Sequence, residues 1–162
     1  MFSLFKKKKE QSQTGFVAYI SGKVVPIEEV NDGIFSAKIL GDGLAIKPEG
    51  NIITAPCDGT VTTVMEDSKH AVGIAANNGL EILIHEGLDT VALEGKGFEL
   101  FVKTGQKIRR GDKLIRFDDQ VLKEKGMNKI CIMVITNSAE YPNLKLYTGM
   151  DAVQGETVIA EI

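Results

Sequence analysis

Two histidines, His70 and His85, flank an Asn78-Gly79 dipeptide, and this arrangement restricts the local fold more than any other part of the chain. Asn-Gly between two apolar runs favours a two-residue β-hairpin turn, because both residues tolerate a positive φ. Such a turn predicts that Val72 lies directly opposite His85. Because paired residues share a face of the ribbon, both histidines are expected on one side. Their backbones would then be diagonal neighbours, roughly 7–8 Å apart.

The same register predicts which side chains accompany the two histidines. Val72 and Ile74 on the first strand and Leu83 on the second are expected on the histidine face, and Ser68 adds a hydroxyl group. A monomer rarely exposes a mostly apolar patch of this kind without using it. These three apolar residues, together with Phe35 from an earlier segment, are therefore predicted to dock a protein partner.

Two neighbouring imidazoles beside a hydroxyl suit the transfer of a phosphoryl group. Neutral imidazole is a good nucleophile near neutral pH. A second imidazole can donate a hydrogen bond to the phosphoryl oxygens in the transition state, and a hydroxyl can orient that second ring. His70, His85 and Ser68 supply these three parts, although the residues alone do not say which histidine would carry the group.

Composition and charge narrow the class of protein. The 162 residues, 43% hydrophobic and 25% charged, are ordinary for one soluble globular domain. A net charge of −3 without a clustered basic face argues against nucleic-acid binding. No apolar run approaches the roughly 20 residues that cross a bilayer, and no signal-peptide pattern is present, so a cytoplasmic location is expected. Cys57 and Cys131 have no CxxC partner and are expected as buried free thiols.

Residues 1–14 differ from the rest of the chain and are predicted to form a flexible arm. They are rich in lysine, glutamine and serine. One interpretation is a solvated tail, because so short a segment forms no stable helix in water. The alternative is a weak contact of residues 1–9 with a membrane surface, in which Phe2, Leu4 and Phe5 enter the lipid interface while four lysines meet anionic head groups.

From Gly15 onward, short apolar runs alternate with Gly, Asp, Asn and Pro. This pattern predicts an all-β domain over residues 15–162, a compact antiparallel sandwich or barrel-like fold of many short strands. The runs interpreted as strands include residues 33–40 and 90–93. The exception is 118–126, where an acidic N-cap, a basic last turn and a final glycine predict one short helix of about two turns.

Several segments carry a more specific signal, namely residues 41–48, 55–61, 69–74, 79–91 and 93–98. Together they closely resemble the glucose-type enzyme IIA family of the bacterial phosphoenolpyruvate:sugar phosphotransferase system. The resemblance covers about residues 15–162, and its central motif, Ile-His-Glu-Gly-Leu-Asp-Thr-Val, is long and specific.

This resemblance implies an antiparallel β-sandwich and a phosphoryl carrier without a cofactor. It implies that His85 accepts a phosphoryl group from phospho-HPr and passes it to an enzyme IIB domain of a sugar permease. It also implies that His70 stabilises the transferred group and that Ser68, where the family usually has threonine, orients His70. Phosphorylation-dependent binding to regulatory protein targets is a further expectation for some members of the family.

The resemblance further implies two carboxylates near the site, Asp32 and Asp89. Repulsion between these acids and the phosphoryl group could help to expel the group toward the next acceptor. Both residues stand in turn-like sequence, so that a turn or capping role is the alternative for each.

Two other classes of protein agree less well with the residues of this chain. A zinc peptidase on a related scaffold needs more histidines than this chain has, although His70 and His85 could become zinc ligands if a docking partner added a carboxylate. No metal is expected to be required. A biotinyl or lipoyl carrier needs its lysine at a turn tip, whereas Lys113 leads directly into an apolar run.

Overall fold

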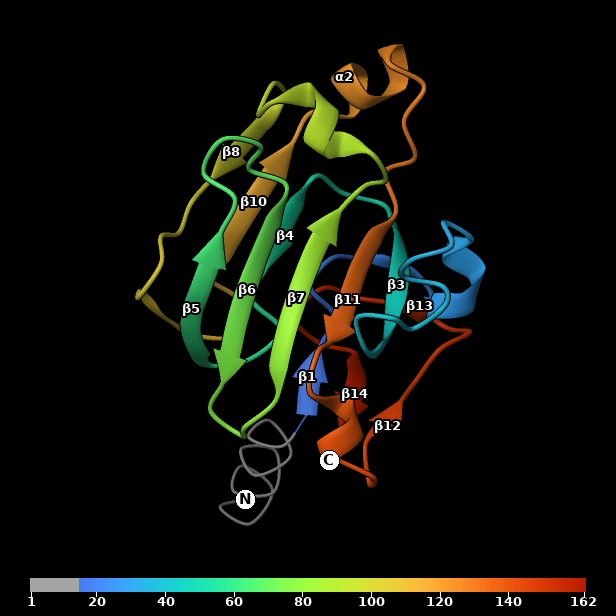
Figure 1. The fold of residues 1–162 in the computed structure, drawn as a ribbon, viewed down its shortest axis with the longest axis vertical. Helices are drawn as coiled ribbons and strands as arrows, with labels where there is room; N and C mark the ends of the chain where they lie inside the picture. The colour runs from blue at the N-terminus through green and yellow to red at the C-terminus, as the bar shows by residue number, and fades with distance from the viewer. Residues whose placement is uncertain (1–14) are drawn as a thin grey trace.

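Figure 1 shows the protein as a computed structural model, which describes residues 15–162. The predicted arm of residues 1–14, with its proposed membrane contact, lies outside the described residues. The described part consists of antiparallel strands with one short α-helix, which confirms the predicted fold class. Within residues 15–162, no helix is long and apolar enough to cross a membrane.

The largest sheet has eight strands in the order β13-β2-β3-β11-β7-β6-β5-β9. Every neighbouring pair in it is antiparallel, and Figure 1 shows its central strands side by side at the front. In sheet order the strands are β13 (Asp151–Ala152), β2 (Gly22–Pro26), β3 (Asp42–Pro48), β11 (Cys131–Ile135), β7 (Glu81–Glu86), β6 (Ala71–Ala76), β5 (Gly59–Val64) and β9 (Lys107–Ile108).

Two smaller sheets of three strands complete the fold. One has the order β4-β10-β8, and β4 and β10 lie behind the large sheet in Figure 1. The other has the order β1-β14-β12. Their bounds are β4 (Ile52–Thr54), β10 (Lys113–Phe117), β8 (Phe98–Leu100), β1 (Gly15–Val17), β14 (Val158–Glu161) and β12 (Lys145–Leu146).

The main core fills the space between the large sheet and the smaller ones. Side chains alternate across a strand, so each strand of the large sheet contributes every second residue to this core. Cys57 and Cys131 belong to it as buried free thiols, which confirms that prediction. Its large-sheet members include Leu44, Ile46, Val72, Ile74, Ile82, Ile84 and Met133, and the residues that face them include Ile53, Ile115 and Phe117.

A second hydrophobic cluster lies on the opposite face of the large sheet, and we call it the outer cluster. Alternation explains its position, because Ala45 stands between two residues of the main core on β3 and therefore points the other way. A short 3₁₀ helix, η1 (Ile27–Val30), and the loop that follows it contribute to this cluster. Its members are Val25, Ile27, Val30, Phe35, Ala45, Ile130, Ile132 and Val134, with Leu88 packed against them.

The loop of residues 31–41 replaces a predicted strand. The apolar run 33–40 was expected to be extended, but the chain there makes successive turns, with positive φ at Asn31, Gly33 and Lys38. Hydrogen bonds within the loop and burial of Phe35 in the outer cluster take the place of strand pairing. The expectation of a strand at 33–40 is therefore wrong.

The helix predicted at 118–126 is present as α2 (Asp119–Glu124). The side chain of Asp118 accepts a hydrogen bond from the backbone N–H of Gln120 at 2.9 Å, which satisfies a donor that the helix cannot pair internally. Gly126 follows the helix with a φ of +65°, as expected for a terminating glycine.

The short run 90–93 is not a strand either, because it forms a 3₁₀ helix, η2 (Thr90–Leu93). Residues with left-handed backbone, Asp89 and Glu94, stand at its two ends and turn the chain too sharply for an extended segment. A third 3₁₀ helix, η3 (Ser138–Glu140), follows β11.

Candidate functional site

The hairpin between β6 and β7 has a register one residue away from the predicted one. Ala71, not Val72, lies opposite His85, and Val72 pairs with Ile84. The connection therefore has three residues, 77–79, and the backbone N–H of Ala76 donates to the carbonyl of Leu80 at 2.9 Å. The predicted two-residue turn is wrong.

In this register, the turn makes contacts with residues that are distant from it in the sequence. The side-chain amide of Asn137 donates to the carbonyl of Gly79, and its oxygen accepts a hydrogen bond from the N–H of Glu81. Gly79 has a φ of +100°, and a Cβ atom there would lie 2.3 Å from the hydroxyl oxygen of Tyr141. A three-residue loop that ends in a residue of positive φ is itself a common hairpin connection.

The shift of one residue exchanges the two faces of β6. Val72 and Ile74 lie in the main core with 0% and 1% of their surface exposed, so neither can dock a partner. Their assignment to the docking surface is therefore wrong. Leu83 remains on the face of His85 and is half-buried.

The two histidines nevertheless lie in contact. Their ring centroids are 4.6 Å apart, and the ring planes are nearly perpendicular at 89°. His70 reaches His85 because it precedes β6 and follows Lys69, whose φ of +56° turns the chain before the strand begins. The carbonyl of His70 accepts a hydrogen bond from the N–H of Glu86 at 2.8 Å, which fixes the backbone next to His85.

The hydroxyl group of Ser68 lies against one edge of the His70 ring. Its Oγ atom is 2.7 Å from Nδ1 of His70, and both residues are buried. This hydrogen bond occupies one ring nitrogen and leaves Nε2 of His70 for other contacts. The structure thus brings together all three residues to which the sequence assigns transfer chemistry.

His85 lies between small and apolar neighbours in the centre of the large sheet. Ala71 and Ile132 flank it on the adjacent strands, and the ring of Phe35 lies 4.9 Å from its own. Its Nδ1 atom is buried without a hydrogen bond among the described residues, so Nε2 is the nitrogen that a partner can reach.

Burial lowers the pKa of His85 to about 4, and the neighbouring His70 contributes to this shift. The carbonyl of Gly87 and the charge of Asp32 oppose the shift, although the carbonyl does not complete a hydrogen bond to Nδ1. Burial also lowers the pKa of His70. Both rings are therefore neutral at neutral pH, which is the nucleophilic form.

The two predicted carboxylates occupy different positions. Asp32 lies in the 31–41 loop, where its Oδ1 atom accepts hydrogen bonds from the N–H groups of Ile34 and Ser36, both at 3.1 Å. Burial favours the neutral acid, but these backbone donors outweigh it and lower the pKa of Asp32. Asp89 precedes η2 with a φ of +61° and makes no side-chain capping bond. Asp32 thus stabilises the loop through these hydrogen bonds, and its negative charge favours the protonated form of His85.

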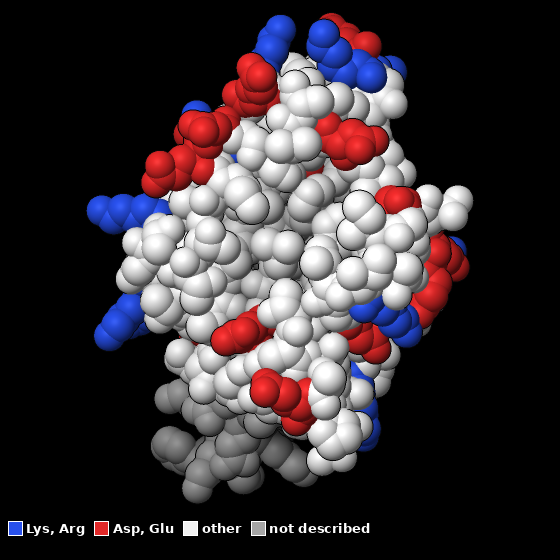
Figure 2. Space-filling model, viewed as in Figure 1, with Lys and Arg blue, Asp and Glu red and all other residues white. Residues whose placement is uncertain are grey.

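The face around the histidines is uncharged at its centre. Figure 2 shows a hollowed white surface there, with acidic side chains around it and basic ones toward the margins. Large apolar side chains that the sequence analysis missed are exposed in the segments that supply Phe35 and Ser68 to the site. They are Ile34, Ile39 and Leu40 in the 31–41 loop, and Met65 and Val91 beside Ser68. Phe35, in contrast, is mostly buried between the outer cluster and His85.

Glu86 is a buried acid directly after His85, and the sequence analysis missed it as well. Alternation along β7 turns its side chain to the interior, where it is fully buried and both carboxylate oxygens lack a hydrogen bond among the described residues. Burial raises the pKa of Glu86 well above its usual value, with the charge of Asp119 adding to the shift and Lys129 opposing it. The sequence signal for this burial was the alternation of apolar residues that precedes Glu86 on β7.

Replacing Glu86 by methionine is expected to stabilise the protein by about 1–3 kcal/mol at pH 8, because a buried polar group without a hydrogen bond is unfavourable. A carboxyl with a raised pKa in the folded state binds more protons there than in the unfolded chain. The stability of the wild type therefore falls as pH rises above about 4.3, the usual pKa of glutamic acid, and the variant lacks this loss.

Urea unfolding at pH 5 and pH 8 measures this difference, with Glu81→Met as the control on an exposed site of the same strand. The advantage of Glu86→Met should be larger at pH 8. A variant that is less stable than the wild type at both pH values would contradict the interpretation.

Comparison with known proteins identifies the class of this histidine site. The family described as "phosphoenolpyruvate-dependent sugar phosphotransferase system, EIIA 1" matches residues 14–141. The chain belongs to this family and is therefore a phosphotransferase component. Within the described residues there is no group of three or more His, Cys, Asp or Glu side chains that could hold a metal ion.

Relatives of known name agree with this membership. The chain is similar to a "PTS system glucose-specific EIIA component" of Bacillus anthracis, with 41% identity over 162 residues, which is 100% of this chain and 96% of the relative. The protein of the same name in Oceanobacillus iheyensis is 40% identical over 99% of this chain and 97% of the relative. Among solved structures, glucose permease IIA from Mycoplasma capricolum matches with a TM-score of 0.77 and 38% identity, covering 90% of this chain and 93% of that one.

Proposed function

We propose that the protein carries a phosphoryl group on His85, which it accepts from phospho-HPr and passes to an enzyme IIB domain of a sugar permease. The observation that supports this proposal best is the contact of two neutral imidazoles, whose ring centroids lie 4.6 Å apart, at the uncharged centre of one face of the large sheet. The family membership supports the same role, and the proposal retains the cytoplasmic location that the sequence favours.

His85 is the nucleophile in this proposal. The lone pair of Nε2 attacks phosphorus, and the bond between phosphorus and the donor breaks as the new N–P bond forms. Nothing needs to remove a proton from Nε2, provided that the proton of the neutral ring is on the buried Nδ1. The transfer to the enzyme IIB domain reverses these roles, with a cysteine thiolate as the attacking group.

His70 stabilises the transferred group. When the hydroxyl of Ser68 donates to Nδ1, the proton of the neutral His70 ring is on Nε2, where it can bond to a phosphoryl oxygen. Ser68 thus determines the tautomer and the orientation of the ring. Asp32 and Asp89 assist by repelling the phosphoryl group toward the next acceptor.

The uncharged face provides the docking surface for both partners. We assign to it the exposed apolar side chains of the loop that carries Phe35 to His85, namely Ile34, Ile39 and Leu40, and those of Met65 and Val91 beside Ser68. Phe35 and Leu83 line the floor near His85. The same face could bind regulatory proteins differently in its two phosphorylation states, and a zinc ion could join the two rings only with a ligand from such a partner.

Incubation with phosphoenolpyruvate, enzyme I and HPr tests the proposed function. We expect incorporation of about one phosphoryl group per chain, stable in alkali and labile in acid, as for a phosphorylated nitrogen. Mixtures without HPr are the control. Incorporation that does not depend on HPr, or none at all, would exclude the carrier role.

The protonation of His85 provides an independent prediction. We expect its ring to titrate with a midpoint of about 4, because burial disfavours the charged form, whereas an unperturbed histidine titrates near 6.5. The lowered pKa means that the neutral nucleophile persists from pH 8 to about pH 5. Nuclear magnetic resonance of the two imidazole rings measures this directly, and a midpoint above 6 for His85 would contradict it.

A further inference from the structure

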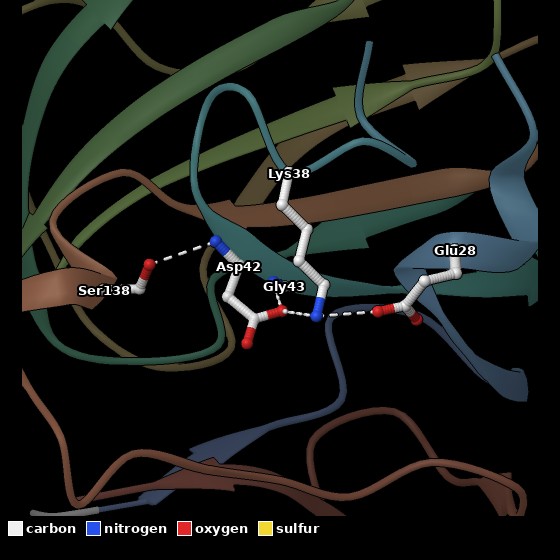
Figure 3. Close-up of polar contacts among 5 residues, drawn as sticks. All are labelled: Glu28, Lys38, Asp42, Gly43 and Ser138. Atoms are coloured by element: carbon white, nitrogen blue, oxygen red, sulfur yellow. Dashed lines mark hydrogen bonds and ion pairs between the residues drawn. The ribbon is translucent and has the colours of Figure 1, made fainter. Parts of the chain in front are cut away.

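Lys38 lies at the point where the 31–41 loop returns to the sheet. Its Nζ atom is 2.7 Å from a carboxylate oxygen of Glu28 and 3.5 Å from one of Asp42. Figure 3 shows the ammonium group between the two acids, one from the helix before the loop and one from the strand after it. A single side chain thus joins the two ends of the loop.

Asp42 is a fixed anchor for this contact. Its backbone N–H donates to the hydroxyl of Ser138 at 3.0 Å, and its Oδ1 atom accepts a hydrogen bond from the N–H of Gly43 at 2.9 Å. It also begins β3, which pairs with β2 and β11 in the large sheet. Because Asp42 cannot move without the sheet, the contact ties the loop to a rigid element.

The two halves of the loop are held differently. Asp32 accepts two backbone hydrogen bonds in the first half, and Phe35 is buried in the outer cluster. The second half, 37–41, contains Ile39 and Leu40, which are 70% and 42% exposed and so have little packing to hold them. The ion pairs of Lys38 are the polar side-chain contacts that the structure gives this half.

The backbone of Lys38 also needs support. Its φ of +58° is unfavourable for a residue with a Cβ atom. Two turn hydrogen bonds depend on this conformation, from the N–H of Lys38 to the carbonyl of Phe35 at 3.0 Å and from the N–H of Gly41 to the carbonyl of Lys38 at 3.3 Å. The ion pairs hold the side chain in the direction that this backbone gives it.

We propose that Lys38 is a positioning residue that holds the second half of the 31–41 loop in the form that partners bind. This inference rests on the proposed function, because Ile39 and Leu40 matter only if the face docks a phosphoryl donor. Ordering a loop on binding weakens affinity, and a loop that is already ordered avoids that cost. Removal of the ion pairs should therefore act on docking and leave the chemistry at His85 unchanged.

Steady-state phosphorylation with phospho-HPr as the varied substrate tests this role. In Lys38→Met and in Glu28→Gln, KM should rise about threefold to tenfold, with kcat within about twofold of the wild type. The two variants change the net charge in opposite directions, so a shared rise cannot come from long-range attraction of the donor. Lys38→Arg should restore a nearly normal KM, because it keeps the charge.

Arg116→Met and Glu99→Gln are the matched controls. They break an equally exposed ion pair, 3.2 Å long, on the sheet formed by β4, β10 and β8. Neither should change KM. A KM in Lys38→Met equal to that of the wild type, or opposite changes in Lys38→Met and Glu28→Gln, would overturn the positioning role.

Amide hydrogen exchange separates this inference from the proposed function, since it needs no partner. In Lys38→Met the amides of residue 38 and of Gly41 should exchange at least fivefold faster, whereas those of Ile34 and Ser36, bonded to Asp32, should not change. Unchanged exchange at residue 38 and Gly41 would overturn the inference even if the protein carries a phosphoryl group.

Discussion

Alanine in place of His85 should abolish phosphoryl uptake from phospho-HPr, reducing incorporation from about one group per chain to background. His70 cannot replace it as the acceptor, because its Nδ1 atom is bonded to Ser68 and only 5% of the residue is exposed. The measurement is incorporation of labelled phosphate from phosphoenolpyruvate in the presence of enzyme I and HPr, quenched in alkali.

The folded state of His85→Ala needs its own measurement. The ring lies on the outer face of the sheet and makes no hydrogen bond through Nδ1, so its removal should leave the main core intact. Thermal unfolding close to that of the wild type would show that a loss of uptake reflects lost chemistry. A folded variant that still takes up a full equivalent would rule out His85 as the acceptor.

Glutamine in place of His70 should separate the two transfers. Glutamine keeps a hydrogen-bond donor, so that His85 should still be phosphorylated, but the amide cannot reproduce the position and tautomer that Ser68 gives the imidazole. Onward transfer to the enzyme IIB domain should therefore fall on the order of 10²–10³-fold, as is typical when one transition-state donor is no longer correctly placed.

Single-turnover transfer from the isolated phosphorylated protein measures this effect. Ser68→Ala should slow the same step less than His70→Gln, because it retains the ring and loses only its orientation. An unchanged rate of onward transfer in His70→Gln would remove His70 from the mechanism.

The hairpin shows how far local sequence determines this site. Asn78-Gly79 predicted a turn between β6 and β7, and a turn is present, but its length differs by one residue. The contacts made by Asn137 and Tyr141 involve residues more than fifty positions away, and a local motif does not report them. Since side chains alternate, this small difference placed Val72 on the wrong face.

The contact between the histidines was predicted correctly from a register that proved incorrect. His70 lies outside β6, so strand alternation does not govern it, and the left-handed Lys69 turns it toward His85. A lysine carries no sequence signal for positive φ, unlike glycine or asparagine. In the 31–41 loop, Asn31 and Gly33 carry that signal, but the turn at Lys38 does not, and the burial of Phe35 against distant strands has no local signal either.

The outer cluster has a kinetic consequence for a relay protein. Ile132 and Phe35, which belong to this cluster, flank the ring of His85, so the platform beneath the reactive nitrogen is packed before any partner arrives. Partners that meet a preformed surface need little rearrangement, and their association approaches the rate set by diffusion and orientation. Many brief encounters can then follow one another, and throughput depends on how often partners collide rather than on how fast the protein changes shape.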